Sequence, residues 1–181
     1  TAQFGIDAAM TLDDAERLHC TETLAWLASG GDLCRIRKPA TPAKHLVAYF
    51  PVMDGQRILL VDHRNAGLWL PTGGHVEPGE HPRDTVSREL LEELGIGLAA
   101  GSIGPPMMLT VTTTVGTTAG HIDVSLWYPV PWRRTAPVAC DESEFREARW
   151  FAFPEIPWNR TDPHLRRFME KWRAATGFRL S

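Results

Sequence analysis

Two segments of the chain place apolar residues at the three- and four-residue spacing of an amphipathic helix. The first covers residues 12–29, where a capping-box pattern opened by Thr11 predicts the start and a pair of glycines predicts the end. The second covers residues 82–94, with Pro82 in its first turn and Gly95 just past its last residue. Both patterns predict helices that pack one apolar face against a core.

A third helix is predicted near the end of the chain, over residues 161–175. Thr161 or Asp162 would cap this helix, and Pro163 would occupy its first turn. Its apolar stripe consists of Leu165, Phe168, Met169 and Trp172. A stripe of this width predicts that the helix also covers one face of the protein.

Runs of β-branched and other apolar residues predict strands before and after the helix at 82–94. Asp54-Gly55 separates the first two runs, and this pair is typical of a hairpin turn. The predicted strands cover residues 46–53, 57–61, 68–71, 107–118, 122–129 and 148–153. Strands on both sides of a central helix predict an α/β fold in which helices cover a mixed β-sheet. We expect a helical extension over residues 1–38 and one domain over residues 39–181.

The bulk composition suits one soluble domain with a small extension. Hydrophobic residues make up 43% of the 181 residues, and the net charge of −3 gives no general attraction for nucleic acid or a membrane surface. No apolar run approaches the roughly 18 residues of a membrane helix, and Thr1–Met10 lacks a signal-peptide pattern. The three separated cysteines form no C-x-x-C pair, so we expect a reducing, cytoplasmic location.

The segment from Gly74 to Ile96 contains the most informative chemistry. On a helix, Glu89, Glu92 and Glu93 share one face, because they are three and four residues apart. Like charges at this spacing repel, and a divalent cation bound by oxygen ligands would remove that cost. The glycines before the helix let the backbone approach a ligand closely. The spacing therefore predicts a site for Mg²⁺, with Mn²⁺ as a possible substitute.

The same segment resembles the Nudix box, G-x5-E-x7-R-E-U-x-E-E-x-G-U, in which U is an apolar residue. Every position of the pattern is matched, the apolar ones by Leu90 and Ile96. The fixed positions are filled by Gly74, Glu80, Arg88, Glu89, Glu92, Glu93 and Gly95. The resemblance implies a Nudix-type α/β/α sandwich with a catalytic loop and helix. It also implies hydrolysis of a diphosphate linkage in a nucleoside diphosphate joined to a group X, with a nucleoside triphosphate as the expected member.

The resemblance assigns roles to residues of the segment. It implies that Glu92 and Glu93 bind Mg²⁺ and that Glu89 is a further ligand or the base acting on the attacking water. It also implies that the carbonyl of Gly73 contacts a metal. Arg88 would orient the glutamates, and Glu80 would brace the loop. In one respect the chain departs from the family, because Thr72 stands between Pro71 and the glycine pair.

Residues outside the box supply further candidates. The family often takes another carboxylate from a late loop, and here Glu142, Glu144 and Glu147 are available, with Glu144 the residue we select. Each of them fits a solvated acidic loop equally well. Arg64, His75 and Trp127 are the candidates for substrate binding, although a surface position for the first two and a core position for the tryptophan are the simpler interpretations. His121 and Asp123 open a strand, where they could contact substrate or be an ordinary polar pair.

Several functional alternatives remain open at this point. The chain could be a nucleotide-sensing module that has lost catalysis, although such modules typically lose the acidic cluster that is intact here. It could act on ADP-ribose or a sugar nucleotide. The isomerase branch of the same fold needs a catalytic cysteine, and neither Cys34 nor Cys140 is well placed for that role. We expect a small nucleotide as the ligand and no nucleic acid or membrane partner. A homodimer is possible, because the N-terminal helix could pack on a second subunit or on its own domain.

Overall fold

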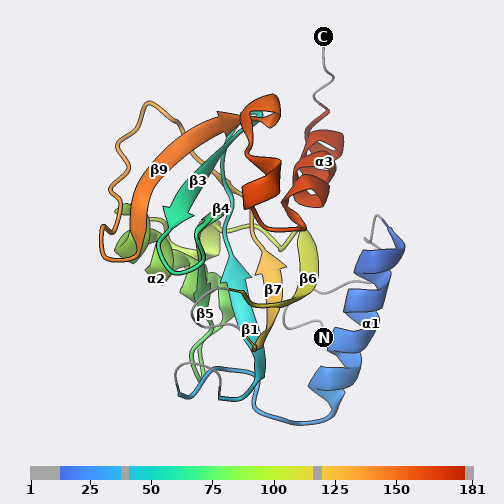
Figure 1. Ribbon diagram of the computed structural model, residues 1–181. Helices are drawn as coiled ribbons and strands as arrows, with labels where there is room; N and C mark the ends of the chain where they lie inside the picture. Colours follow the sequence, from blue (N-terminus) through green and yellow to red (C-terminus); the bar gives the residue numbers. More distant parts are fainter. Residues whose placement is uncertain (1–12, 38–40, 116–119, 178–181) are drawn as a thin grey trace.

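The computed structural model describes residues 13–37, 41–115 and 120–177 (Figure 1). The described helices are α1 (Asp14–Ala28), α2 (Pro82–Leu94) and α3 (Leu165–Thr176). The described strands are β1 (Lys44–Tyr49), β2 (Val52–Asp54), β3 (Arg57–His63), β4 (Leu68–Leu70), β5 (Gly73–His75), β6 (Met108–Thr113), β7 (Ile122–Trp127), β8 (Val130–Pro131) and β9 (Phe145–Ala152). Short 3-10 turns cover Ala100–Ser102 (η3), Phe153–Glu155 (η4) and Trp158–Arg160 (η5).

The strands form two mixed sheets. The first has the order β5-β1-β7-β6, with β1 and β7 parallel and the other neighbours antiparallel. In the second, β9 pairs with one edge of β3, while β2 and β4 pair with the two ends of its other edge. Strand β8 extends this sheet by pairing in parallel with β2. The predicted α/β fold with a mixed sheet is confirmed, and the sheet is divided into two.

The division occurs inside the predicted strand 46–53, at Phe50-Pro51. Proline has no amide hydrogen to donate to a ladder, which favours a strand boundary. The buried Phe50 turns its own amide toward the carbonyl of Thr72, at 2.9 Å. As a result β1 belongs to the first sheet and β2 to the second, so one stretch of chain contributes to both.

Two hydrophobic cores lie on opposite faces of the sheets, as alternation along a strand requires. Leu46 and Ala48 of β1 join the core under α2, which contributes Val86, Leu90 and Leu94. The core under α3 contains Leu165, Phe168 and Met169 together with Met53, Ile58, Leu60 and Trp127. Figure 1 shows α2 and α3 on the two sides of the sheet layer, so the predicted α/β/α sandwich is confirmed.

Helix α1 lies beside β6, the edge strand of the first sheet (Figure 1). Its residue Glu16 accepts a hydrogen bond from the backbone amide of Leu109 at 3.3 Å, and its Cys20 joins the core under α2. The helix therefore packs on its own chain. The predicted boundary between residues 38 and 39 lies outside the described residues, so the two-part division of the chain stays a prediction.

Two helix starts differ from the sequence expectation. Helix α1 is capped by Asp13, whose carboxylate accepts from the amide of Glu16 at 2.8 Å, and Thr11 lies outside the described residues. Helix α3 begins at Leu165, because the hydroxyl of Thr161 donates to the carbonyl of Trp69, at 2.5 Å, and binds the chain to β4 instead. Asp162, the other predicted cap, accepts from the amide of His164 at 2.7 Å in the turn before the helix. None of the described helices is long and apolar enough to cross a membrane.

Candidate functional site

Helix α2 presents the acidic face that the sequence predicts, and its bounds match the predicted 82–94. His81 caps the first turn by accepting from the amide of Arg83, and Pro82 follows it. At the other end Gly95 adopts a left-handed conformation, with φ of 65°, that closes the helix. The apolar side of α2 is buried on β1, so its carboxylates are held at the opposite side by a fixed backbone.

Arg88 connects the loop before α2 to the carboxylates on it. Its guanidinium donates to Glu80 at 3.1 Å and to Glu89 at 2.6 Å. It also reaches the carboxylate of Glu92 and the carbonyl of His75, each at 3.4 Å. Burial opposes ionisation of Glu80, yet its hydrogen bonds from Arg88 and Thr85 lower the pKa of this carboxyl below its usual range. Arg88 therefore holds Glu89 in place, as the sequence resemblance implies.

Glu93 is the most unusual of the three carboxylates. Its side chain is buried, and within the described residues its Oε2 atom has no hydrogen-bond partner. Burial, followed by the charges of Glu89 and Glu144, raises the pKa of Glu93 to about 9. Burial also raises the pKa of Glu89, against the opposing effect of Arg88. A buried carboxylate oxygen without a donor, close to two further carboxylates, fits a divalent cation bound by oxygen ligands.

The two glycines of β5 let Glu89 and Tyr49 pack directly on the backbone of this strand. A Cβ atom added to Gly74 would lie 2.2 Å from the Cδ atom of Glu89. A Cβ atom added to Gly73 would lie 2.2 Å from the ring of Tyr49 and 3.2 Å from the carbonyl oxygen of Ala48. The glycine pair therefore makes room for Glu89 on one side and for Tyr49 on the other.

A cavity of about 240 Å³ adjoins the carboxylates. Glu93, Gly73 and His75 line it, so three predicted site residues meet at one pocket. Its wall also contains residues that the sequence did not select as a group, among them Arg35, Tyr49, His63, His121, Asp123 and Asp162. Burial raises the pKa of Asp162 to about 6. Sequence spacing gives no signal for this wall, since its members come from separate strands and loops.

The late loop lies close to α2 and places Glu144 near the carboxylates. The amide of Asp141 donates to the carbonyl of Glu93 at 3.0 Å, which connects the loop to the end of the helix. The charge of Glu144 contributes to the raised pKa of both Glu89 and Glu93. Among the late-loop candidates, this electrostatic effect on both carboxyl groups favours Glu144 as the additional carboxylate of the site. Glu147 is exposed on β9, where the register with β3 shifts.

Arg64 supports that loop instead of lining the cavity. Its Nε atom donates to the carbonyl oxygen of Glu142 at 2.9 Å and to that of Phe145 at 3.2 Å. Its backbone amide donates to the carbonyl of Glu144 at 2.9 Å. Among the described lysines and arginines, Arg35 lines the pocket. Burial lowers the pKa of Arg35, while the charges of Asp123 and Glu89 oppose that effect.

The expectation that Trp127 contacts the substrate is wrong for this structure. Its side chain is completely buried in the core under α3. The indole stacks on Phe168 at 5.3 Å between ring centroids and donates its Nε1 hydrogen to Thr110 at 2.9 Å. No face of the ring is left for a base, because the parity of β7 turns residue 127 toward α3 rather than toward the open pocket.

An acidic helix face, a close glycine loop and a pocket are the parts found in enzymes that bind Mg²⁺ together with substrate phosphates. Residues 43–172 match the NUDIX domain, and the chain therefore belongs to the Nudix family. The MutT protein from Methanosarcina mazei has the same fold, with a TM-score of 0.60 and 20% identity, over 74% of this chain and 95% of that one.

Two relatives extend the comparison to proteins with a stated activity. A Bacillus subtilis protein provisionally named an 8-oxo-dGTP diphosphatase is 44% identical over 46 residues, which are 25% of this chain and 31% of that protein. The NAD-capped RNA hydrolase NudC of Haemophilus influenzae is 29% identical over 119 residues, which are 59% of this chain and 40% of that protein. The matches thus span less than half the length of either relative.

Proposed function

We propose that the chain hydrolyses a diphosphate linkage in a nucleoside diphosphate derivative with the help of Mg²⁺, and that nucleoside triphosphates are its main substrates. The observation that supports this proposal most strongly is the buried, unpartnered oxygen of Glu93 in the wall of the pocket. A structural helix would gain stability by replacing such a group with an apolar one. Membership of the Nudix family agrees with the proposed reaction.

In this proposal the carboxylates of Glu92 and Glu93 and the carbonyl of Gly73 hold the cation. When bound, Mg²⁺ or Mn²⁺ would lower the pKa of water and offset charge on the phosphate oxygens. Glu89 either adds a ligand or accepts the proton from the attacking water. Its raised pKa suits the second role, because a more basic carboxylate accepts a proton more readily.

The remaining site residues support this chemistry by position. Arg88 bridges Glu80 and Glu89 and thereby fixes the direction of the Glu89 carboxylate. Glu144, whose charge acts on Glu89 and Glu93, is the proposed late-loop carboxylate. Arg35 and His75, both in the wall, are the proposed contacts for substrate phosphates.

The substrate class is supported by the names of the relatives. One is named for 8-oxo-dGTP, which is a nucleoside triphosphate, and the other for RNA capped with NAD, a dinucleotide whose two nucleosides are joined through a diphosphate. Both names describe a substrate that contains a nucleotide with a phosphate anhydride. They support a nucleotide for this chain and leave the base to experiment.

A panel of nucleotides with Mg²⁺, in which phosphate and pyrophosphate release are measured separately, tests the proposal. Pyrophosphate from a triphosphate would confirm the proposed class, whereas mononucleotides from NADH or ADP-ribose would assign the activity to dinucleotide or sugar-nucleotide substrates. Glu92→Gln together with Glu93→Gln should abolish Mg²⁺-dependent turnover. Glu147→Gln, an exposed change on β9, is the matched control and should keep the wild-type rate.

Turnover that survives loss of both glutamates would refute the assigned site. Tight nucleotide binding without turnover across the whole panel would instead identify a sensing module. Cation dependence should be measured with Mg²⁺ and Mn²⁺ in parallel, since both accept oxygen ligands.

A further inference from the structure

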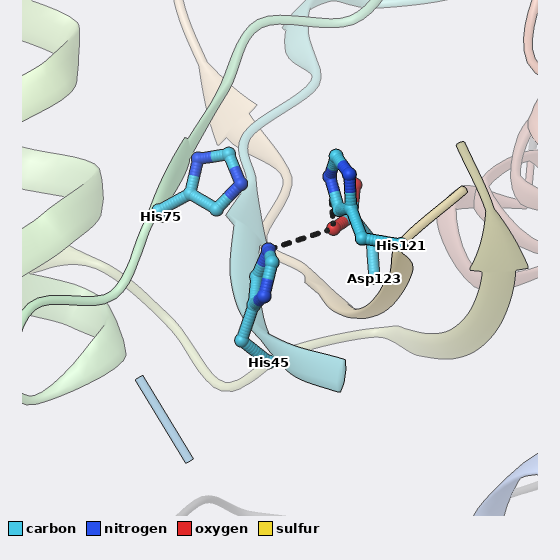
Figure 2. A group of neighbouring side chains, drawn as sticks. All are labelled: His45, His75, His121 and Asp123. Carbon is cyan, nitrogen blue, oxygen red and sulfur yellow. Dashed lines mark ion pairs between the residues drawn. The ribbon is translucent and has the colours of Figure 1, made fainter. Parts of the chain in front are cut away.

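Three histidines and one aspartate converge at the wall of the pocket (Figure 2). They are His45, His75, His121 and Asp123, and one ligand atom from each lies within 4.8 Å of all the others. His45 and His121 are buried, while His75 and Asp123 are partly exposed. His75 occupies a variable position of the Nudix box, and the other three residues lie outside the box.

Strand register explains how residues so far apart in sequence meet. His45 and Asp123 are direct neighbours in the parallel pair of β1 and β7, so their side chains lie on the same face. His121 precedes Asp123 by two residues and projects to that face as well. His75 of β5 is opposite Val47, which is two residues after His45. All four side chains therefore project from one face of the first sheet, and Figure 2 shows them around a shared space.

The hydrogen bond of the Nδ1 atom of His45 identifies the tautomer of this imidazole. Its Nδ1 atom lies 2.9 Å from the carbonyl oxygen of Pro42, and a carbonyl only accepts, so Nδ1 carries the hydrogen. In a neutral imidazole the Nε2 atom then presents a lone pair. That lone pair is directed at the carboxylate of Asp123, with 3.2 Å between Nε2 and Oδ1. Two acceptors facing each other need a proton or a cation between them.

His121 repeats this arrangement on the other side of Asp123. Its Nδ1 atom is 3.1 Å from the hydroxyl of Thr114, and the same hydroxyl lies 3.2 Å from the carbonyl oxygen of His121. A hydroxyl that donates to the carbonyl accepts from Nδ1–H, which leaves Nε2 as an acceptor, 3.4 Å from Oδ1 of Asp123. Metal-binding histidines are typically oriented in this way, by an outer partner on the second nitrogen.

The distances and donors indicate which cation fits. In a tetrahedral site with bonds of about 2.0–2.1 Å, neighbouring ligand atoms are about 3.3 Å apart. The two distances from Asp123, 3.2 and 3.4 Å, match this edge, and the other pairs of ligand atoms lie within 4.8 Å, from which the side chains would close on an ion. Three imidazole nitrogens with one carboxylate are ligands that suit Zn²⁺, whereas Mg²⁺ prefers oxygen. We propose that His45, His75, His121 and Asp123 form a Zn²⁺ site that is separate from the carboxylates of α2.

The site would join three strands that come from distant parts of the chain. An ion held by β1, β5 and β7 would hold His75, the last residue of β5, against the centre of the sheet. A zinc-bound His75 would no longer contact a phosphate, so that role would then belong to Arg35 in the pocket wall. It would also fix one side of the nucleotide pocket, which His75, His121 and Asp123 line. Zinc binding should therefore raise the stability of the folded protein, because the unfolded chain does not assemble the site.

The test uses the full chain, stripped with a chelator, and ZnCl₂ as the probe in excess Mg²⁺ and without nucleotide. We expect one bound equivalent by titration calorimetry and elemental analysis, a rise in Tm, and the visible absorption of tetrahedral Co²⁺ when cobalt replaces zinc. Imidazole ¹H–¹⁵N spectra of the wild type should show three perturbed histidines. Since this readout needs no variant, it decides the matter even if a substitution prevents folding.

Variants identify the ligands. Asp123→Asn and His121→Gln should each weaken zinc binding by about 100-fold or more, and Thr114→Val by about 10- to 100-fold, as expected for an outer partner. His63→Gln changes another histidine of the pocket wall and should leave the affinity unchanged. Glu92→Gln with Glu93→Gln should also retain zinc, which separates this proposal from the proposed hydrolysis.

Three results would overturn the zinc site. One is the absence of saturable binding, which would leave His45 and Asp123 as a proton-sharing pair. Another is binding that persists in both Asp123→Asn and His121→Gln. The third is binding that disappears with the two glutamates of α2, which would assign the ion to the Nudix carboxylates.

Discussion

Lys171 of α3 and Glu16 of α1 form an almost completely buried ion pair, with the ammonium 2.8 and 2.9 Å from the two carboxylate oxygens. The side chains are only 10% and 5% exposed. Beside them Arg167 donates two hydrogen bonds of 2.8 Å to Asp13, at the start of α1. Two helices from opposite ends of the sequence are thus joined by two ion pairs, of which the one between Lys171 and Glu16 is buried.

Replacing one member of the buried pair should be costly. Lys171→Met leaves the carboxylate of Glu16 buried without its cation, and we expect the free energy of unfolding to fall by about 3 kcal/mol. Urea denaturation measures this change. The control is Arg17→Met, which removes the exposed pair with Asp14 on the same helix and should change stability by less than about 1 kcal/mol. Equal effects of the two variants would contradict the importance of burial here.

Gly74→Ala should reduce activity more than stability. The new methyl group would overlap Glu89, whose flexible side chain can move away, so the fold should survive. Displacing this carboxylate by about 1 Å would lower kcat by about 100-fold if Glu89 acts in the proposed reaction. Steady-state kinetics with the best substrate, together with thermal unfolding, separates the two effects. An unchanged kcat would show that the position of Glu89 is unimportant.

Gly73→Ala should reduce stability more than activity. Here the methyl group would overlap the ring of Tyr49 and crowd the carbonyl of Ala48. The ring is held against Trp127 at 4.8 Å between centroids, so it has little freedom to yield. Overpacking of this kind costs about 1–3 kcal/mol. A decrease in Tm larger than that of Gly74→Ala is the expected result, and the reverse order would contradict this account of β5.

The pKa of Glu93 predicts how stability depends on pH in the metal-free protein. An acid whose folded-state pKa is about 9, against 4.5 unfolded, keeps its proton longer when folded. Stability from this group is complete below pH 4.5 and is lost as pH rises toward 9, by up to about 1.4 kcal/mol per pH unit. Urea denaturation at several pH values in a chelator should show this slope.

Two comparisons test whether the slope comes from Glu93. Glu93→Gln has no proton to release and should flatten the dependence. In the proposed site Mg²⁺ would bind the ionised carboxylate, so adding Mg²⁺ should also flatten the pH dependence by stabilising the protein more at high pH than at low pH. A wild-type slope that neither change affects would assign the titration to another group.

The sequence predicts the bounds of a helix well where local contacts define them and poorly where distant contacts do. The helix over 82–94 was predicted to the residue, because Pro82 and Gly95 define its ends through their own backbone preferences. The start of α3 was misplaced because Thr161 bonds to Trp69, a partner 92 residues away that no local pattern reveals. Local signals predict an element well until a tertiary bond competes with them.

The residues of the candidate site also differ in whether local spacing or tertiary contacts bring them together. Glu89, Glu92 and Glu93 could be grouped from spacing alone, since a helix fixes which residues share a face. The prediction that Trp127 contacts the substrate is wrong because the strand pattern does not tell which face of the sheet the indole covers. The position of α3 determines that this face is buried. The sequence could not group His45, His75, His121 and Asp123, because their grouping depends on the registers of β1, β5 and β7, which the sequence does not determine.

The position of α1 has a consequence for solubility. Strand β6 is the outer strand of the first sheet, and an uncovered outer strand offers its amides to any other extended chain. By lying along β6 and accepting the amide hydrogen of Leu109 through Glu16, α1 blocks that edge with a side chain that cannot propagate a ladder. The N-terminal helix thereby protects the hydrolase fold from strand-to-strand aggregation.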